Sequence, residues 1–244
     1  MYKLQTYKQQ GFTLIELLVV VSIIALLIAI LLPALGAARR TARTTVCLSN
    51  SRQMAIAIVN FATENKMDLP TVGFSHGGNV YAEQGSWFFG LEPYVDGKLM
   101  YRCPSDDSPA WEIPEGGRLR RVGYASSFIL SGLIAGKYKN FNNLDRIPSA
   151  SKTVYAVELA ETSVAGFAVA DHVHPETWGG DPALIEDTIK EQVEIEQHQD
   201  KSNYTYLDGH AETLARKDTF DIAPGSTVTN IIWNSNHFWP DVAR

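Results

Sequence analysis

The hydrophobic pattern of the chain is dominated by one nearly uninterrupted apolar run. Within residues 12–32 only Thr13, Glu16 and Ser22 are polar, and the other residues are almost all Leu, Ile, Val and Ala. A helix needs about 20 apolar residues to cross the core of a bilayer, and it satisfies its own backbone hydrogen bonds there. The pattern predicts one membrane-spanning helix over about 12–32.

Beyond this run the pattern becomes that of an amphipathic helix. Pro33 bends a helix, but residues 34–42 that follow it are good helix formers. Four apolar residues then recur at helical spacing and form one stripe: Cys47, Met54, Ile58 and Phe61. We therefore predict a single helix over 12–65, with its first half in membrane and its second half packed on a domain. An irregular coil over 40–65 is the alternative.

From residue 66 to residue 244 the composition shifts to Gly, Pro and aromatic residues, as expected for a globular head. The segments with a recognisable pattern are strands at 123–130 and 153–159, a further short strand at 167–170, a short helix or edge strand at 87–95, and an irregular loop at 171–182. An acidic helix is predicted at 182–197, with its inward face formed by Leu184, Ile185, Thr188 and Ile189.

The strongest hairpin signal is Asp208-Gly209, which stands between alternating runs at 203–207 and 210–214. Asp-Gly at this position favours a two-residue type I′ turn, because both turn residues need positive φ. Taken together, the pattern predicts an α+β fold in which the long N-terminal helix packs on a mainly antiparallel sheet.

The charge of the chain argues against a nucleic-acid partner. The 244 residues carry a formal charge of −6, and the basic residues are scattered. Lys3 and Lys8 precede the apolar run, which the positive-inside tendency assigns to the cytoplasmic side. The bulk of the chain is then extracytoplasmic, although three arginines just beyond the run argue the other way: Arg39, Arg40 and Arg43.

The chain has two cysteines, Cys47 and Cys103. In an oxidising compartment such a pair readily forms a disulfide. This one closes a loop of about 57 residues, for which the chain-entropy model gives about 4 kcal/mol. Two buried free thiols are the alternative.

Glu16 is the residue of the apolar run that requires a partner, because a carboxylate in lipid is costly. If the chain is cut after Gly11, the new amino group of Phe12 supplies a cation four residues away on the same helix face. In an assembly, the amine of one chain can instead meet the carboxylate of its neighbour. An interfacial Glu16 near lipid headgroups is the other interpretation.

The order of a short basic segment, Gly11, Phe12-Thr13-Leu14-Ile15-Glu16 and an apolar run resembles the processing signal of type IV pilins and type II secretion pseudopilins. The resemblance implies that residues 1–11 are a leader, that a prepilin peptidase cleaves after Gly11 and methylates Phe12, and that Glu16 acts in assembly. Unlike a secretory signal, this cut leaves the anchor on the protein.

Further segments resemble one subgroup of pilin-like proteins, among them 47–55, 101–106 and 147–158. That subgroup is named for a His, nine residues and Asp-Gly, and here His198 is followed by nine residues and Asp208-Gly209. Residues 160–195 have no counterpart in it.

Several clusters have the residue types for metal binding or catalysis. Two histidines, His172 and His174, face the same side of an extended chain and can start a zinc site. Asp106 and Asp107 can supply oxygens to calcium, which some similar pseudopilins carry in their head loops. A solvated or hydrogen-bonded loop is the alternative for both. His198 with Asp208 can suggest an acid–base pair, but turn and packing roles explain them better, so no catalytic residue is expected.

The sequence thus predicts a non-enzymatic subunit of a type IV pilus or type II secretion pseudopilus-like filament. Its expected partners are the prepilin peptidase, other pilin-like subunits, the inner-membrane assembly machinery and lipid. Its expected location is the inner membrane, as a single-pass protein with an extracytoplasmic head, from which it enters a periplasmic or cell-surface filament. The alternative is an anchored head that binds a ligand, such as a carbohydrate, and does not polymerise. Five tryptophans suit sugar stacking, although tryptophans more often lie in a core: Trp87, Trp111, Trp178, Trp233 and Trp239.

Overall fold

The computed structural model describes residues 12–73, 86–95, 101–115, 119–133, 141–162, 169–179, 181–227, 233–241 and 243. Contacts along the chain divide it into two compact units, Met1–Ala42 and Arg43–Arg244. The second unit holds the strands and short helices that the structure describes, together with the later part of the long helix.

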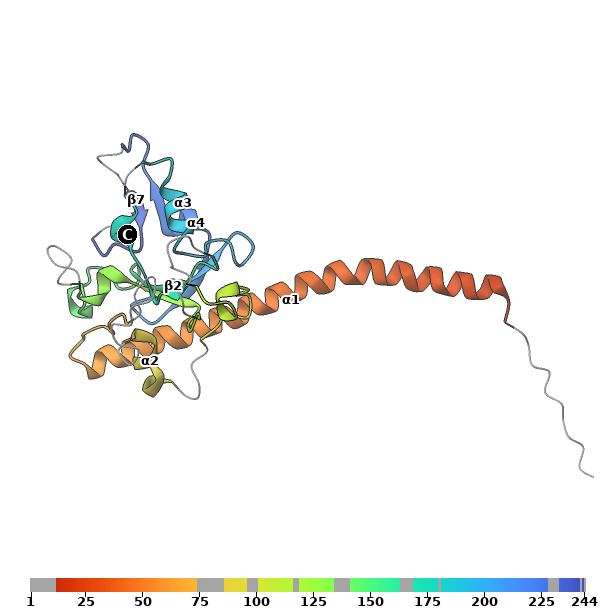
Figure 1. Ribbon diagram of the computed structural model, residues 1–244, viewed down its shortest axis with the longest axis horizontal. Helices are drawn as coiled ribbons and strands as arrows, with labels where there is room; N and C mark the ends of the chain where they lie inside the picture. Colours follow the sequence, from red (N-terminus) through yellow and green to blue (C-terminus); the bar gives the residue numbers. More distant parts are fainter. Residues whose placement is uncertain are drawn as a thin grey trace, which may run out of the picture. The chain divides into compact units, whose positions relative to one another are not determined.

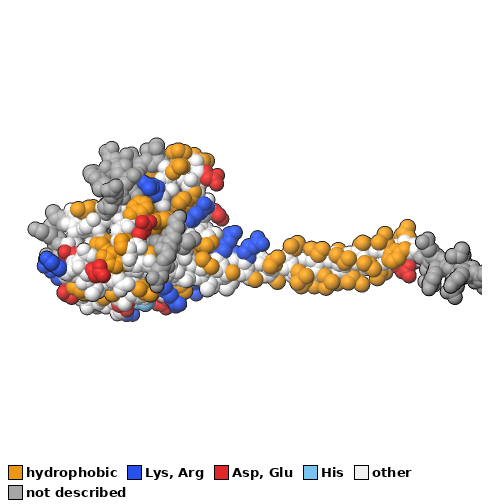
Figure 2. Space-filling view, turned by 90° about the horizontal axis from the view of Figure 1, so that it is seen from below, with side chains coloured by type: hydrophobic (Ala, Val, Ile, Leu, Met, Phe, Trp, Pro, Cys, Tyr) orange, Lys and Arg blue, Asp and Glu red, His pale blue; other side chains and the backbone are white. Residues whose placement is uncertain are grey.

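Helix α1 (Leu14–Glu64) is close to the predicted 12–65, so the predicted long helix is confirmed. Pro33 lies inside it without ending it. In the first unit the apolar side chains of α1 are exposed, and Figure 2 shows them covering this segment. By length and composition, α1 is the one described helix that is able to cross a membrane.

The later part of α1 buries one face in the second unit. The four residues of the predicted stripe lie on this face: Cys47, Met54 and Ile58 are buried, and Phe61 packs against the same cluster. The polar Asn50 and Ser51 are also buried, which the apolar stripe alone did not indicate. The buried face is therefore wider than predicted, and it includes polar groups.

The central sheet has five strands in the order β3-β1-β2-β4-β5. They are β1 (Tyr124–Ser127), β2 (Val154–Glu158), β3 (His172–Val173), β4 (Ser202–Tyr206) and β5 (Ala211–Leu214). Strand β3 pairs with β1 in parallel, and the other neighbouring pairs are antiparallel. The predicted α+β class with a mainly antiparallel sheet is confirmed.

Two hydrophobic clusters hold the second unit together. One joins α1 to the sheet and contains Met54, Ile58 and Tyr155. The other contains Val157 and Tyr204 of the sheet, with residues from the C-terminal elements. Figure 1 shows the sheet between α1 on one side and α3, α4 and β7 on the other. The site described below lies where α1 meets the sheet.

The remaining elements are short. The helices are α2 (Trp87–Gly90), α3 (Ile185–Lys190) and α4 (Arg216–Thr219), and β6 (Phe220–Ile222) pairs with β7 (Trp233–Asn236) in a second sheet. Short 3-10 helices occupy Glu92–Tyr94, Pro109–Trp111, Phe128–Ser131, Leu144–Arg146 and Pro175–Thr177. The segment 87–95 is thus helical rather than an edge strand.

Several predicted elements differ from the structure. The strand predicted at 123–130 ends at Ser127, where a 3-10 helix begins. The loop predicted at 171–182 contains strand β3. Of the strand predicted at 167–170, residues 167 and 168 lie outside the described residues, and residues 169 and 170 are not in a strand.

The acidic helix predicted at 182–197 is helical only in α3. After it the chain runs beside the end of β2: the Glu194 N–H donates to the Glu158 carbonyl, and Val193 pairs with Leu159. These contacts with the sheet replace further helical hydrogen bonds. The inward assignment of Leu184 was also wrong, because this side chain is 57% exposed, whereas Ile185 and Ile189 are buried as predicted.

The predicted hairpin between β4 and β5 is confirmed, but its turn is not the predicted type I′ turn. Three residues, Leu207, Asp208 and Gly209, connect Tyr206 to His210, whose carbonyl accepts from the Tyr206 N–H. Only Gly209 has positive φ, at 95°. The longer loop places Leu207 in the α1 cluster, where it is fully buried, and a two-residue turn would not supply that side chain.

Candidate functional site

The N-terminal end of α1 is closed by a reciprocal pair of hydrogen bonds. The Thr13 hydroxyl accepts from the Glu16 N–H at 3.2 Å, and the Glu16 carboxylate accepts from the Thr13 N–H at 2.8 Å. The Thr13 hydroxyl also donates to that carboxylate at 2.8 Å. This is a capping box, whose Thr-x-x-Glu signal stands in the sequence. Glu16 therefore has a partner within its own chain, Phe12 is 70% exposed, and Gly11 lies outside the described residues.

Cys47 of α1 and Cys103 form a disulfide, with their Cα atoms 5.1 Å apart. Both cysteines are fully buried in the cluster between α1 and the sheet. The Ser105 N–H donates to the Cys103 sulfur at 3.4 Å. The bridge therefore ties the loop around Cys103 to the middle of α1.

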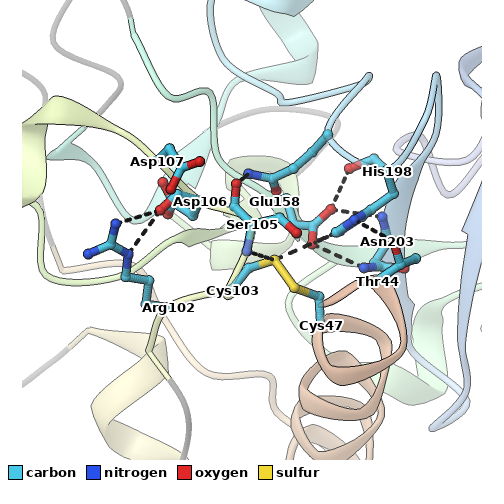
Figure 3. The surroundings of a disulfide bond; sticks show 12 residues. Thr44, Cys47, Arg102, Cys103, Ser105, Asp106, Asp107, Glu158, His198 and Asn203 are labelled. Atoms are coloured by element: carbon cyan, nitrogen blue, oxygen red, sulfur yellow. Dashed lines mark hydrogen bonds and ion pairs between the residues drawn. A yellow bond between two sulfur atoms is a disulfide. The ribbon is translucent and has the colours of Figure 1, made fainter. Parts of the chain in front are cut away.

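His198 lies directly beside this disulfide, as Figure 3 shows. Its Nε2 is 3.8 Å from the Cys103 Sγ and 2.8 Å from the Glu158 Oε1. Its Nδ1 is 3.1 Å from the Thr44 hydroxyl of α1. The imidazole therefore connects the long helix, the disulfide and the end of strand β2, with its side chain almost completely buried.

Glu158 is the centre of this network. Its Oε2 accepts from the Ser202 hydroxyl at 2.8 Å and from the Asn203 N–H at 3.0 Å. Its Oε1 accepts from the Asn203 side-chain amide at 3.0 Å in addition to the contact with His198. A carboxylate buried this deeply is tolerable only when its oxygens are paired in this way. Burial and the neighbouring Glu158 raise the pKa of the Tyr124 hydroxyl.

The spacing of the His-x9-Asp-Gly signature has a direct structural meaning. His198 precedes strand β4, and Asp208-Gly209 follows it, so the nine residues between them span the strand and its flanking turns. Gln199 and Asp200 both have positive φ, at 60° and 62°, and the His198 N–H donates to the Lys201 carbonyl. This tight turn directs His198 toward Glu158, at the cost of backbone strain in two residues that are not glycine.

Asp106, a predicted calcium candidate, is a structural residue here. Its Oδ2 lies 3.0 Å from the Arg120 guanidinium, and its Oδ1 accepts from the Ser108 N–H. Burial raises the pKa of the Asp106 carboxyl and outweighs the opposing effect of Arg120. The N–H of Asp107 donates to Glu161, and its side chain is exposed. The two aspartates are thus not arranged as a pair of ligands.

The buried ion pair makes Gly123 sensitive to substitution. A Cβ at Gly123 would lie 2.5 Å from the Asp106 Oδ2, which Arg120 holds in place. We expect Gly123→Ala to destabilise the second unit by about 1–3 kcal/mol, the usual range for overpacking. Urea unfolding of the full chain in detergent measures this. Gly179→Ala is the matched control, because nothing lies within 4 Å of its added Cβ; equal midpoints for the two variants would contradict the prediction.

The zinc candidates, His172 and His174, lie side by side. Their ring centroids are 4.9 Å apart, and both rings contact Phe128. The Nδ1 of His172 contacts the buried Asp171, and the Nδ1 of His174 contacts Glu176 at 2.5 Å. The structure therefore brings together the histidines that the alternation predicted, each with a carboxylate beside it.

The tryptophans expected to stack on sugars are not presented together. Trp87 and Trp178 are buried in the two hydrophobic clusters, and the Trp87 indole N–H donates to the Asp171 carbonyl. Trp111 and Trp239 are half-buried, and the side chain of Trp233 lies outside the described part of the structure. Burial removes Trp87 and Trp178 from any stacking surface.

Two family models match the chain. One, described as the prokaryotic N-terminal methylation motif, covers residues 6–32. The chain is a pilin-like protein with a prepilin-type N-terminal signal. The second model, described as a protein of unknown function (DUF1559), covers residues 36–133. A search of curated proteins and a search of solved structures found no match.

In this pilin-like protein the methylation motif spans the predicted leader boundary and the apolar run. The motif implies processing by a prepilin peptidase and assembly with other pilin subunits, and it agrees with a membrane anchor and an extracytoplasmic head. The assigned roles of Gly11, Phe12 and Glu16 remain predictions.

Sequence reasoning missed three residues of the site that the pilin-like head builds around His198. Thr44 and Glu158 are its hydrogen-bond partners, and Asn203 holds Glu158. The sequence did contain a signal for Glu158, because it is an acidic residue at the end of a predicted strand that is otherwise apolar. Such a pattern indicates a buried carboxylate, but it does not indicate which residue binds the carboxylate.

Proposed function

We propose that this pilin-like protein is a structural subunit of a type IV pilus or a type II secretion pseudopilus-like filament, with an assembly role rather than catalysis. The observation that carries the proposal is the methylation motif at residues 6–32, which includes the apolar first part of α1, where the side chains are exposed. Such a surface is stable in lipid or against the same helix of neighbouring subunits. In this proposal the helix moves from the inner membrane into a helical bundle, with the inner-membrane assembly machinery as partner.

Glu16 gives the proposal its mechanism. In the uncut chain its carboxylate is held by Thr13 at 2.8 Å, so the capping box already lowers the cost of a charge near lipid. Cleavage after Gly11 frees the amine of Phe12, next to the capping residue, and the peptidase then methylates it. In a filament the amine of one subunit can then pair with Glu16 of its neighbour, which links removal of the leader to polymerisation.

The disulfide supports an extracytoplasmic location for the head in this proposal. Structural disulfides form and persist in oxidising compartments, and this one is buried between α1 and the sheet. The proposed location is therefore the inner membrane, with the head outside the cytoplasm until the subunit enters a periplasmic or cell-surface filament.

Glu16→Ala tests the proposal in native cells. We expect this variant to be cleaved but to enter filaments at a small fraction of the parental level, because the proposed intersubunit partner of the Phe12 amine is gone. Sheared filament fractions measure incorporation, and mass spectrometry measures the N-terminus, where a chain beginning at methylated Phe12 is expected. Glu64→Ala is the matched control, since Glu64 is an exposed glutamate at the other end of α1.

Normal incorporation of Glu16→Ala would reject the assembly mechanism. A native chain that keeps residues 1–11 would reject processing. Cut chains that never enter any filament would favour the alternative of an anchored ligand-binding head.

A further inference from the structure

The disulfide and its neighbours bring four metal-ligand groups together. The Sγ atoms of Cys47 and Cys103, an oxygen of Glu158 and a nitrogen of His198 all lie within 4.8 Å of one another. All four residues are buried. Within the described residues, this is the one group found in which at least three His, Cys, Asp or Glu side chains bring their ligand atoms close together.

The dimensions of the cluster suit a small tetrahedral ion. With Zn–S bonds of about 2.3 Å and Zn–N or Zn–O bonds of about 2.0–2.2 Å, a tetrahedral zinc site separates its donor atoms by roughly 3.3–3.8 Å. The His198 Nε2 is already 3.8 Å from the Cys103 Sγ. The Nε2 to Glu158 distance is 2.8 Å, so it has to widen only slightly, whereas the two sulfurs must separate by breaking their bond.

Hydrogen bonds from neighbouring residues hold three of the four groups in the orientation that a metal ligand needs. Metal-binding histidines usually use their second ring nitrogen for a hydrogen bond, and the Nδ1 of His198 has the Thr44 hydroxyl for this. The Glu158 carboxylate is oriented by Ser202 and Asn203. The Ser105 N–H donates to the Cys103 sulfur at 3.4 Å and so fixes its position. Figure 3 shows Thr44, Ser105, Glu158, His198 and Asn203 around the sulfur atoms.

We propose that the reduced chain binds one zinc ion through the thiolates of Cys47 and Cys103, the Nε2 of His198 and the carboxylate of Glu158, and that oxidation to the disulfide releases the ion. The reduced chain exists before the disulfide forms, so zinc would hold the same loop to α1 that the disulfide later holds. The site would thus act as a temporary clamp during maturation of the head.

Zinc binding releases two protons, one from each thiol, and His198 binds the ion through Nε2 in the tautomer whose Nδ1–H donates to the Thr44 hydroxyl. One cysteine thiolate then attacks a disulfide-bonded oxidant, which forms a mixed disulfide and frees one thiolate of the oxidant. The second cysteine thiolate attacks this mixed disulfide at the protein sulfur and displaces the oxidant's other thiolate. The two electrons pass to the oxidant, which leaves as a dithiol, and the sulfurs become bonded to each other. The remaining His198 and Glu158 pair with one another, as the structure shows.

Cobalt substitution tests the site in the full chain in detergent. The protein is reduced with a phosphine, desalted without oxygen and titrated with Co²⁺. We expect one equivalent to bind, with visible bands of tetrahedral cobalt and a near-ultraviolet sulfur-to-cobalt charge-transfer band. Added zinc should displace the cobalt and so remove both the visible bands and the charge-transfer band. The oxidised protein should show neither, because its sulfurs are bonded to each other.

Variants identify the ligands. His198→Gln should weaken cobalt and zinc binding by more than about tenfold, as loss of a ligand or of its support does. His210→Gln is the matched control, since His210 lies on the hairpin with its side chain 40% exposed, and its affinity should equal that of the parent. Adding an oxidised dithiol to the zinc-loaded protein should release one zinc for every two thiols lost, which a chromogenic chelator measures.

Three results would overturn the proposal. The first is a reduced parental protein that binds no cobalt, whether its circular dichroism spectrum is that of a folded or of an unfolded chain. The second is cobalt bound without the sulfur charge-transfer band. The third is equal affinity of His198→Gln and His210→Gln. If His198→Gln fails to fold, the parental charge-transfer band and the ratio of zinc to thiols decide the question without it.

Discussion

Glu158→Ala should destabilise the second unit by about 3–5 kcal/mol, because each buried hydrogen-bond donor that is left without an acceptor costs about 1–3 kcal/mol. The substitution leaves the His198 imidazole, the Ser202 hydroxyl and both Asn203 donors buried without their acceptor. For a unit of this size the melting temperature should fall by roughly 10 °C. Thermal and urea unfolding of the oxidised full chain, followed by tryptophan fluorescence, measure the change.

Two further variants separate charge from packing. Glu158→Gln keeps the side-chain shape but removes the negative charge beside His198, so it should be destabilised less than Glu158→Ala. Glu212→Ala, an exposed glutamate on β5, is the control and should remain within about 0.5 kcal/mol of the parent. A Glu158→Ala variant within about 1 kcal/mol of the parent would mean that the network adds little stability.

The elements that the sequence predicted well are those whose signal is local. The apolar run at 12–32 and the stripe through Cys47, Met54 and Ile58 determine α1, since helical periodicity depends only on neighbouring residues. Strand β2 was likewise visible as the predicted strand at 153–159, and the hairpin of β4 and β5 was visible as alternation on both sides of Asp208-Gly209. Each of these signals lies within one segment of the chain.

The elements that were missed depend on partners far along the chain. The predicted helix at 182–197 stops early because Val193 and Glu194 pair with the end of β2. The type I′ turn was assigned to Asp208-Gly209, but consecutive positive φ values occur instead at Gln199-Asp200, and also at Lys66-Met67, and neither pair contains a glycine that would indicate it. Tertiary contacts impose both features, so local propensity could not indicate them.

Only part of the site around His198 could be predicted from the sequence, for the same reason. His198 was noticed because its spacing to Asp208-Gly209 matches a signature, and a bridge between Cys47 and Cys103 was one of two open interpretations. Neither observation placed the histidine beside the disulfide. The histidine reaches the disulfide only because α1, β2 and the turn before β4 meet in the fold. These segments lie far apart in the sequence, since the two cysteines are already 56 positions apart.

Removing the disulfide should have an effect of similar size to removing Glu158. Cys47 and Cys103 are separated by 56 residues, and the chain-entropy model assigns about 4 kcal/mol to a loop of this length. The double variant Cys47→Ala with Cys103→Ala should therefore unfold at a much lower urea concentration, with some further loss because both sulfurs are buried. Ser49→Ala, at an exposed position of the same helix, is the control and should match the parent.

The reduced parent distinguishes loop closure from sulfur packing. It keeps both sulfur atoms but loses the link, so it should lose about 4 kcal/mol if loop closure dominates. Reduced parent and oxidised parent of equal stability would contradict the entropic account. Zinc should restore part of the stability to the reduced parent and none to the double alanine variant, because a metal that binds only the folded state stabilises it through ligands that the variant lacks.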